Sequence, residues 1–312
     1  MKTDAKIDVA AQSFGKPELM FYALLTLRQH SGYLVDTVYI NDEMSDHDTL
    51  AFYNSKTFLS ALSGWRVRIC SGRRGSGERR PLAPGFMPSG RTSGNALFRG
   101  LAYLLQTMSL FSGKTDIRYQ RAIDSTDKDY LFLMHDSMEF RDDVPGRYLT
   151  CMKAMDKPGI TGELGQCWQC GYHADPECYC SPRAILSGSR PQPDWPLTSS
   201  ANTAARRNCR INEWCALLSV RAAKAIAEKE HSLFGDCDDC GDIGAYWFHM
   251  AVKNGYEFAD PFPEQEQRDR NYKHCWQEMP GRAVRGERSK GKSACSRELI
   301  KKRIAEKYGI VV

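Results

Sequence analysis

Long apolar runs are missing from the 312-residue sequence, and no stretch approaches the roughly 18 apolar residues that a membrane-spanning helix needs. The first residues lack the pattern of a secretory signal and lead straight into a short strand-like run. Charge of one sign is not in large excess either, since the formal net charge is +5. These absences argue against a membrane-embedded, secreted or uniformly basic protein. We therefore expect a cytoplasmic protein.

The composition is that of a globular protein, with 42% hydrophobic and 26% charged residues. The length fits one large α/β domain with insertions, or two domains. Twelve cysteines in a chain of this kind favour metal binding or small buried thiols over disulfides. Basic residues concentrate in 66–99 and 282–303, which indicates anionic partners at those places only.

Apolar runs alternate with helical repeats along the chain, so we expect an α/β fold with a mostly parallel sheet flanked by helices. Strands are predicted at 7–12, 37–40, 65–70 and 130–134. Helices are predicted at 17–30, where Pro17 suits the first position, and at 95–111. A terminal amphipathic helix is predicted over 296–308, with Leu299, Ile300 and Ile304 on one side.

The strand at 130–134 ends abruptly in polar residues, His135-Asp136-Ser137, with Glu139 just beyond. Ligands of open α/β sheets bind at the carboxyl ends of strands, so this position is a candidate site. The alternative is that His135 and Asp136 only cap a turn.

Four segments, taken in order, resemble landmarks of the nucleotide-sugar-dependent glycosyltransferases with the A-type, Rossmann-like fold, family 2 in particular. The match is one of pattern and order over about residues 1 to 260, and the segments are 7–30, 40–46, 94–100 and 130–137. The resemblance implies that the nucleoside is held by Ser13, Phe14, Glu18 and Asp42.

In that family an Asp-x-Asp motif after the fourth strand binds a divalent cation that bridges the donor diphosphate. A hard cation neutralises the charge that gathers on the leaving nucleoside diphosphate. Here His135 and Ser137 replace the two outer aspartates, which leaves Asp136 as the one strong hard ligand. The His135–Asp136 pair favours Mn²⁺ over Mg²⁺, although the change fits weak metal dependence equally well. Arg99 and the arginines of the 71–94 loop are candidates for the remaining phosphate compensation.

The segment from Phe234 to His249 resembles the Glu-Asp motif of the family at the start of a helix. An inverting transfer needs a general base that deprotonates the acceptor hydroxyl. By position Asp242 matches that base, with Asp238 and Asp239 as rivals. The alternative is that these carboxylates only stabilise the helix N-terminus. Residues 212–221, a predicted strand running into a helix, resemble the segment that closes over the acceptor.

Four cysteines between these landmarks form a C-x-x-C and a C-x-C pair, namely Cys167, Cys170, Cys178 and Cys180. Paired thiolates at this spacing fit a closed, structural tetrahedral Zn²⁺ site. A replacement for one of the four is available from His173, Cys209, Cys215, Cys237 or Cys240. Unlinked thiols and a disulfide are the alternatives.

The sequence therefore predicts an A-type glycosyltransferase domain over 1–262, with a Cys-rich insertion at about 162–215 and a basic extension over 263–312 that ends in a helix. The expected enzyme moves a sugar from a nucleotide-sugar donor to a saccharide or lipid-linked acceptor, with inversion, in bacterial polysaccharide or glycoconjugate synthesis. The basic extension is a candidate for peripheral contact with the inner face of a membrane. A zinc-containing nucleic-acid-binding protein and a degenerate transferase that only binds are the rival functions, and nucleic acid is the less favoured partner.

Overall fold

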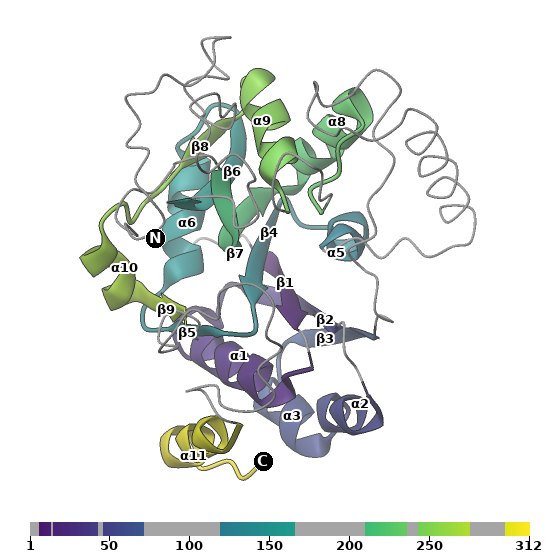
Figure 1. Cartoon of the computed structure of the whole chain (residues 1–312), viewed down its shortest axis with the longest axis vertical. Coiled ribbons are helices and arrows are strands. Elements are labelled where there is room, and N and C mark those ends of the chain that lie inside the picture. The colour runs from purple at the N-terminus through teal and green to yellow at the C-terminus, as the bar shows by residue number, and fades with distance from the viewer. Residues whose placement is uncertain are drawn as a thin grey trace, which may run out of the picture.

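The computed structural model describes residues 6–13, 15–42, 46–71, 119–165, 210–235, 243–274 and 297–312 (Figure 1). Within this part of the chain seven strands form one sheet in the order β3-β2-β1-β4-β7-β6-β8. The strands are β1 (Ile7–Ser13), β2 (Val35–Asp42), β3 (Arg66–Ser71), β4 (Tyr130–His135), β6 (Pro158–Gly165), β7 (Arg210–Ser219) and β8 (Glu257–Ala259). β7 runs antiparallel to both of its neighbours, and the other pairs are parallel. The predicted α/β class with a mostly parallel sheet is confirmed.

Successive residues of a strand point to opposite faces of the sheet, so buried strands present an apolar surface on both faces. Helices cover both of these faces. Val9 and Ala11 pack in a core with α1 (Pro17–Ser31), α6 (Val144–Lys153) and α11 (Arg297–Tyr308). Ala10, between them in the chain, packs in a second core with α5 (Gln120–Ser125), α8 (Val220–Glu230) and α9 (Ala245–Lys253). The sheet is thus the middle of three layers.

Polar side chains at helix starts bind the first free backbone amides, which sets where several helices begin. Asp46 caps α2 (His47–Tyr53), Ser55 caps α3 (Lys56–Ala61) and Ser219 caps α8. The Ser219 cap explains why the predicted strand-to-helix segment changes structure at that residue.

A second, two-stranded sheet joins β5 (Met138–Phe140), just after β4, to β9 (Tyr272–His274). The strands are antiparallel, and Met138 pairs with His274. α10 (Gln265–Asn271) leads into β9 and buries Arg268, which forms ion pairs with Asp260 at 2.9 Å and Glu163 at 3.5 Å. Residues 265–274 therefore contact β5, just after β4, through β9, and contact Glu163 of β6 through Arg268.

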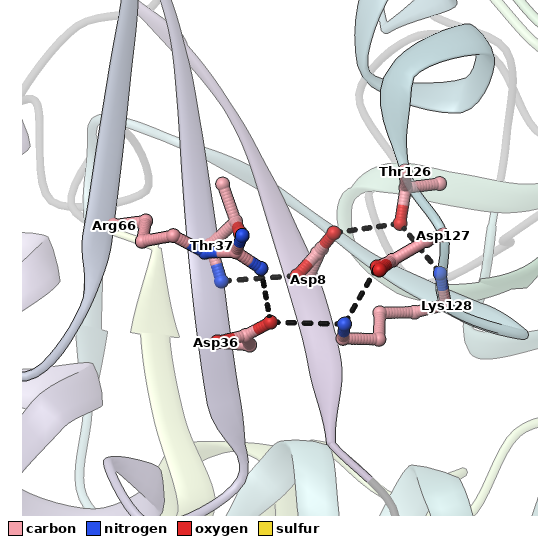
Figure 2. Close-up of polar contacts among 7 residues, drawn as sticks. All are labelled: Asp8, Asp36, Thr37, Arg66, Thr126, Asp127 and Lys128. Carbon is pink, nitrogen blue, oxygen red and sulfur yellow. Dashed lines mark hydrogen bonds and ion pairs between the residues drawn. The ribbon is translucent and has the colours of Figure 1, made fainter.

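A polar network lies at the amino ends of β1 and β2, opposite the edge where β4 ends (Figure 2). The buried carboxylate of Asp8 accepts hydrogen bonds from the Thr37 amide at 2.9 Å and the Thr126 hydroxyl at 2.6 Å. Lys128 forms ion pairs with Asp36 at 2.9 Å and with Asp127 at 2.6 Å. The network connects the turn before β4 to β1 and β2. It therefore stabilises the sheet at the edge opposite the one where β4 ends.

The predicted strands at 7–12, 37–40, 65–70 and 130–134 and the helix at 17–30 are all present, within a few residues of their expected bounds. The terminal helix is present as α11, where Ile300 and Ile304 are buried but Leu299 remains 36% exposed. The predicted apolar side was therefore too wide. The helix expected at 95–111 lies outside the described residues. Among the helices described here, none has the length and apolar character to cross a membrane.

Candidate functional site

The strand order reverses direction between β1 and β4, since β2 and β3 lie on one side of β1 and β4 lies on the other. Such switch points leave a crevice at the carboxyl ends of the strands, where ligands of open α/β sheets bind. Ser13 at the end of β1 donates a hydrogen bond to Asp136 Oδ2 over 3.1 Å. The Asp136 amide donates to the Gln12 carbonyl over 3.0 Å. Two of the predicted site residues thus meet at the switch point, and both are buried.

Asp42, at the end of β2, is fully buried and holds the loop that follows β1. Its Oδ1 accepts a hydrogen bond from the Gly15 amide at 3.0 Å, and its Oδ2 accepts one from the Tyr53 hydroxyl at 2.8 Å. Gly15 has a φ of 61°, a conformation that glycine adopts without a steric cost. Burial, followed by the charge of Asp42, raises the pKa of Tyr53, so this hydroxyl stays a neutral donor. In this structure Asp42 acts on the chain itself by shaping the loop.

Glu18, in the first turn of α1, is directed at the C-terminal helix. Its carboxylate lies 3.6 Å from Arg297 Nε and 3.8 Å from Lys301 Nζ, both on α11. The carboxylate is nearly buried, so the two cations provide its neutralisation. No local sequence pattern predicts this pairing, because the partners lie at opposite ends of the chain.

The antiparallel strand β7 is irregular where it passes the end of β4: its register with β6 shifts between Gly162 and Leu164. Such irregularities redirect side chains. His135 Nε2 lies 3.7 Å from Glu213 Oε1. The other carboxylate oxygen of Glu213, Oε2, accepts a hydrogen bond from the fully buried Arg210. His135 therefore contacts β7 while Asp136 contacts β1. The structure places the two members of the predicted metal pair against different partners.

His274, at the end of β9, completes this cluster and was not foreseen from the sequence. Its ring stacks on Trp214, with centroids 5.2 Å apart and planes 14° from parallel, and its Nε2 lies 3.1 Å from the Ser137 hydroxyl. Burial, and then the positive charges of His135 and Lys16, lower the pKa of His274 to about 3. The ring is therefore neutral at physiological pH. A three-residue strand carries no periodicity, so no sequence signal marked this residue.

A small, partly open hollow of about 20 Å³ lies between β1, β2, β3 and α5, lined among others by Tyr39, Asn41, Arg68 and Arg121. The guanidinium of Arg68 lies 5.7 Å from the centre of the Tyr39 ring. Asn41 donates from its amide nitrogen to Gln12 at 2.9 Å, while its buried Oδ1 has no hydrogen-bond partner among the described residues. The hollow is thus lined by an aromatic ring and two arginines beside the ends of β1 and β2.

The remaining predicted site residues fall outside the described part of the chain. They are Phe14, Arg99, the three candidate bases Asp238, Asp239 and Asp242, and the cysteines Cys167, Cys170, Cys178 and Cys180, together with His173, Cys209, Cys237 and Cys240. Cys215 is described: it is buried in β7, 3.9 Å from the Tyr148 hydroxyl, and burial raises the pKa of its thiol. Within the described ranges no three His, Cys, Asp or Glu side chains form a group that could hold a metal ion.

Scans of the sequence against protein-family models and against curated proteins find no match. Solved structures with a similar arrangement include a mannosyltransferase from Pyrobaculum calidifontis in complex with GDP-Man and Mn²⁺, at 9% identity and a TM-score of 0.45, with 84% of this chain covered. This chain spans only 56% of the length of that protein. An active-site mutant of LgtC matches at 10% identity over 96% of both chains, with a TM-score of 0.44. The mannosyltransferase Ktr4p from S. cerevisiae, in complex with GDP, matches at 12% identity over 87% of this chain and 71% of its own, with a TM-score of 0.40.

Proposed function

We propose that the protein is a glycosyltransferase that moves a sugar from a nucleotide-sugar donor to a hydroxyl acceptor. The observation that carries the proposal is the hydrogen bond between Ser13 and Asp136 at the switch point of the sheet, because that crevice is where nucleotides bind in open α/β folds. The choice of glycosyl transfer among nucleotide-dependent reactions rests on the order of the sequence landmarks.

The donor nucleoside is proposed to lie along the ends of β1 and β2, beside the hollow. Asn41 Oδ1 is a buried acceptor that has no partner among the described residues, so a ligand N–H or O–H that reached it would gain a hydrogen bond. Arg68 and Arg121, which line the same hollow, supply positive charge near the path of the phosphates. Glu18 and Asp42 act on this site through the chain itself, since Asp42 binds Gly15 and Tyr53 and Glu18 pairs with residues of α11.

The donor diphosphate is proposed to lie over Asp136. A carboxylate suits Mn²⁺ or Mg²⁺, and a bound cation would neutralise the charge that develops on the leaving diphosphate. Asp136 fits as one ligand, because its carboxylate is held by Ser13 at the strand end. The predicted second ligand, His135, fits less well, since its ring faces Glu213. A single protein carboxylate predicts that the metal strengthens nucleotide binding without being indispensable to it.

The finer features of the proposal rest on the sequence alone. Asp242 is proposed as the general base of an inverting transfer, with Asp238 and Asp239 as its rivals, and the four cysteines as a structural Zn²⁺ site. A bacterial polysaccharide or glycoconjugate as product, a cytoplasmic location and peripheral contact of the basic C-terminal residues with the membrane belong to the same proposal.

The test is calorimetric titration of the full-length protein with UDP, GDP, CDP and dTDP, each with and without Mn²⁺. We expect micromolar binding of one nucleotide, strengthened by Mn²⁺ and weakened at least about tenfold by Asp136→Asn, since a charged contact is worth more than about 1.4 kcal/mol. Asp48→Asn is the matched control, because Asp48 is exposed on α2, where its carboxylate lies 3.7 Å from His47 Nδ1.

Binding of none of the four nucleotides in either condition would overturn the proposal. A nucleotide that binds is then tested as its UDP-, GDP-, CDP- or dTDP-sugar for release of the nucleoside diphosphate. Tight binding with no release from any sugar, in the presence of Mn²⁺ and candidate acceptors, would instead identify a binding protein that keeps the fold.

A further inference from the structure

Gly15, in the loop between β1 and α1, is held from both sides by residues that are distant in the sequence. Its amide donates to Asp42 Oδ1 at 3.0 Å, and its carbonyl accepts from Arg297 Nη2 at 2.7 Å. Arg297 is the first residue of α11, whereas Asp42 is the last residue of β2. The loop that begins two residues earlier at Ser13 is thus clamped between the sheet and the C-terminal helix.

α11 packs against α1 along its length, and this packing sets the position of Arg297 at its first residue (Figure 1). Ile300 and Ile304 are buried in the core that contains α1. Tyr308, at the far end, donates a hydrogen bond to Gln29 at 3.1 Å, and its ring makes an edge contact with Tyr22 at 6.5 Å. α11 therefore has contacts at its first residue, in its middle and at its last residue, and these hold it in one position relative to α1.

α11 also changes the electrostatics beside the switch point. Glu18 lies in the first turn of α1, directly after the loop that follows β1, and its nearly buried carboxylate would repel a diphosphate bound at the end of β1. Arg297 and Lys301 neutralise that carboxylate, at 3.6 and 3.8 Å. With α11 removed, the loop would lose its hydrogen bond at Gly15 and the site would gain an uncompensated negative charge. Both changes disfavour an anionic ligand.

We infer that α11 is an activating C-terminal strap and that Arg297 is a positioning residue for donor binding. The inference rests on the proposed function, in that the ligand is a nucleoside diphosphate at the switch point. Arg297 acts through Gly15 and Glu18. Its hydrogen bond to the Gly15 carbonyl holds the loop between β1 and α1 in the conformation that binds the ligand, and its positive charge offsets the negative charge of Glu18. Removing Arg297 should therefore weaken nucleotide binding while the folded core persists, because the side chain is 57% exposed.

The experiment compares full-length Arg297→Ala with Lys302→Ala, a control on the exposed side of the same helix whose partner is Glu306. Calorimetry with the nucleotide that the wild type binds should show about tenfold weaker binding for Arg297→Ala and no change for Lys302→Ala. Arg297→Lys should recover part of the loss, because an ammonium group still supplies charge to Glu18. Adding Glu18→Gln to Arg297→Ala should also recover part of it, which a purely structural role of Arg297 would not predict. Unchanged or tighter binding by Arg297→Ala would overturn the inference.

Hydrogen exchange at the Gly15 amide separates this inference from the proposed function, because it needs no ligand. In Arg297→Ala we expect exchange of that amide to be about tenfold faster, with no change in Lys302→Ala. Failure of the wild type to bind any nucleotide would end the proposed function and the donor role of α11 together. If the wild type binds no nucleotide but Gly15 exchanges faster in Arg297→Ala, then Arg297 stabilises the loop but has no role in donor binding. An unchanged exchange rate of the Gly15 amide in Arg297→Ala would show that Arg297 does not stabilise the loop.

Discussion

The Ser13 hydroxyl donates a hydrogen bond to the Asp136 carboxylate over 3.1 Å, although the two residues are separated by 123 positions in the sequence. The bond crosses from the end of β1 to the end of β4, the two strands between which the order of the sheet reverses. A carboxylate fixed in this way is oriented before any ligand arrives, which lowers the entropic cost of binding.

Replacement of Ser13 by alanine should therefore cost both stability and affinity. One hydrogen bond to a buried carboxylate is lost, so we expect the free energy of unfolding to fall by about 1.5 to 3 kcal/mol. Urea unfolding measures this change. Ser60→Ala is the control, because Ser60 is exposed on α3, and it should stay within about 0.5 kcal/mol of the wild type. Equal stability of the two variants would contradict the prediction.

The network at the amino ends of the strands offers a second comparison (Figure 2). Asp8→Ala leaves the Thr37 amide and the Thr126 hydroxyl without their acceptor in a buried place. We expect it to destabilise the fold by about 2 to 3 kcal/mol in urea. Asp127→Ala removes a carboxylate that is 74% exposed and bound only to Lys128 in Figure 2, and should cost about 1 kcal/mol or less. A smaller effect at Asp8 than at Asp127 would refute this account of the network.

Two arginines of α10 differ sharply in environment and provide the third test. Arg268 is buried between Asp260 and Glu163, so Arg268→Met removes the buried cation that both carboxylates contact and should cost about 3 to 5 kcal/mol. Arg270 is 69% exposed and pairs with Glu266 one turn away, so Arg270→Met should cost about 1 kcal/mol or less. Denaturant midpoints of the two variants measure the difference directly. Similar midpoints would show that the buried cluster is dispensable.

His274 predicts a specific dependence of stability on pH. Its pKa is lowered from 6.5 to about 3 in the folded state, so the unfolded chain binds a proton first as the pH falls. The stabilisation from neutral His274 is complete above about pH 6.5 and is lost toward pH 3, at about 1.4 kcal/mol per pH unit. The difference in unfolding free energy between wild type and His274→Gln should therefore shrink from pH 7.5 to pH 5. A constant difference over that range would contradict the lowered pKa.

The sequence allowed β1, β2, β3, β4 and β7 of the central sheet to be predicted, because buried strands leave apolar runs, whereas β6 was missed. Leu131 to Met134 is such a run, and all four residues are fully buried in β4. Strands of three residues leave no such pattern, and for this reason β5, β8 and β9 were missed. The antiparallel direction of β7 was missed as well, since a strand has the same pattern of residues in either direction.

For the candidate site, residues at strand ends were accessible from the sequence and residues brought in by tertiary contacts were not. Ser13, Asp42 and Asp136 follow apolar runs and do lie at the ends of β1, β2 and β4. Their binding roles remain predictions. Glu213 and His274 approach His135 only because β7 is irregular and β9 pairs with β5, which no local pattern reveals.

The antiparallel course of β7 has a consequence for how the chain between β6 and β7 can vary. β6 ends at Gly165 and β7 begins at Arg210, and these two residues are paired at the same edge of the sheet as Ser13 and Asp136. Since the two anchor points are already adjacent, a change in the number of residues between them costs little in closure entropy. Closure entropy therefore sets no strong limit on the length of the connection between these two strands.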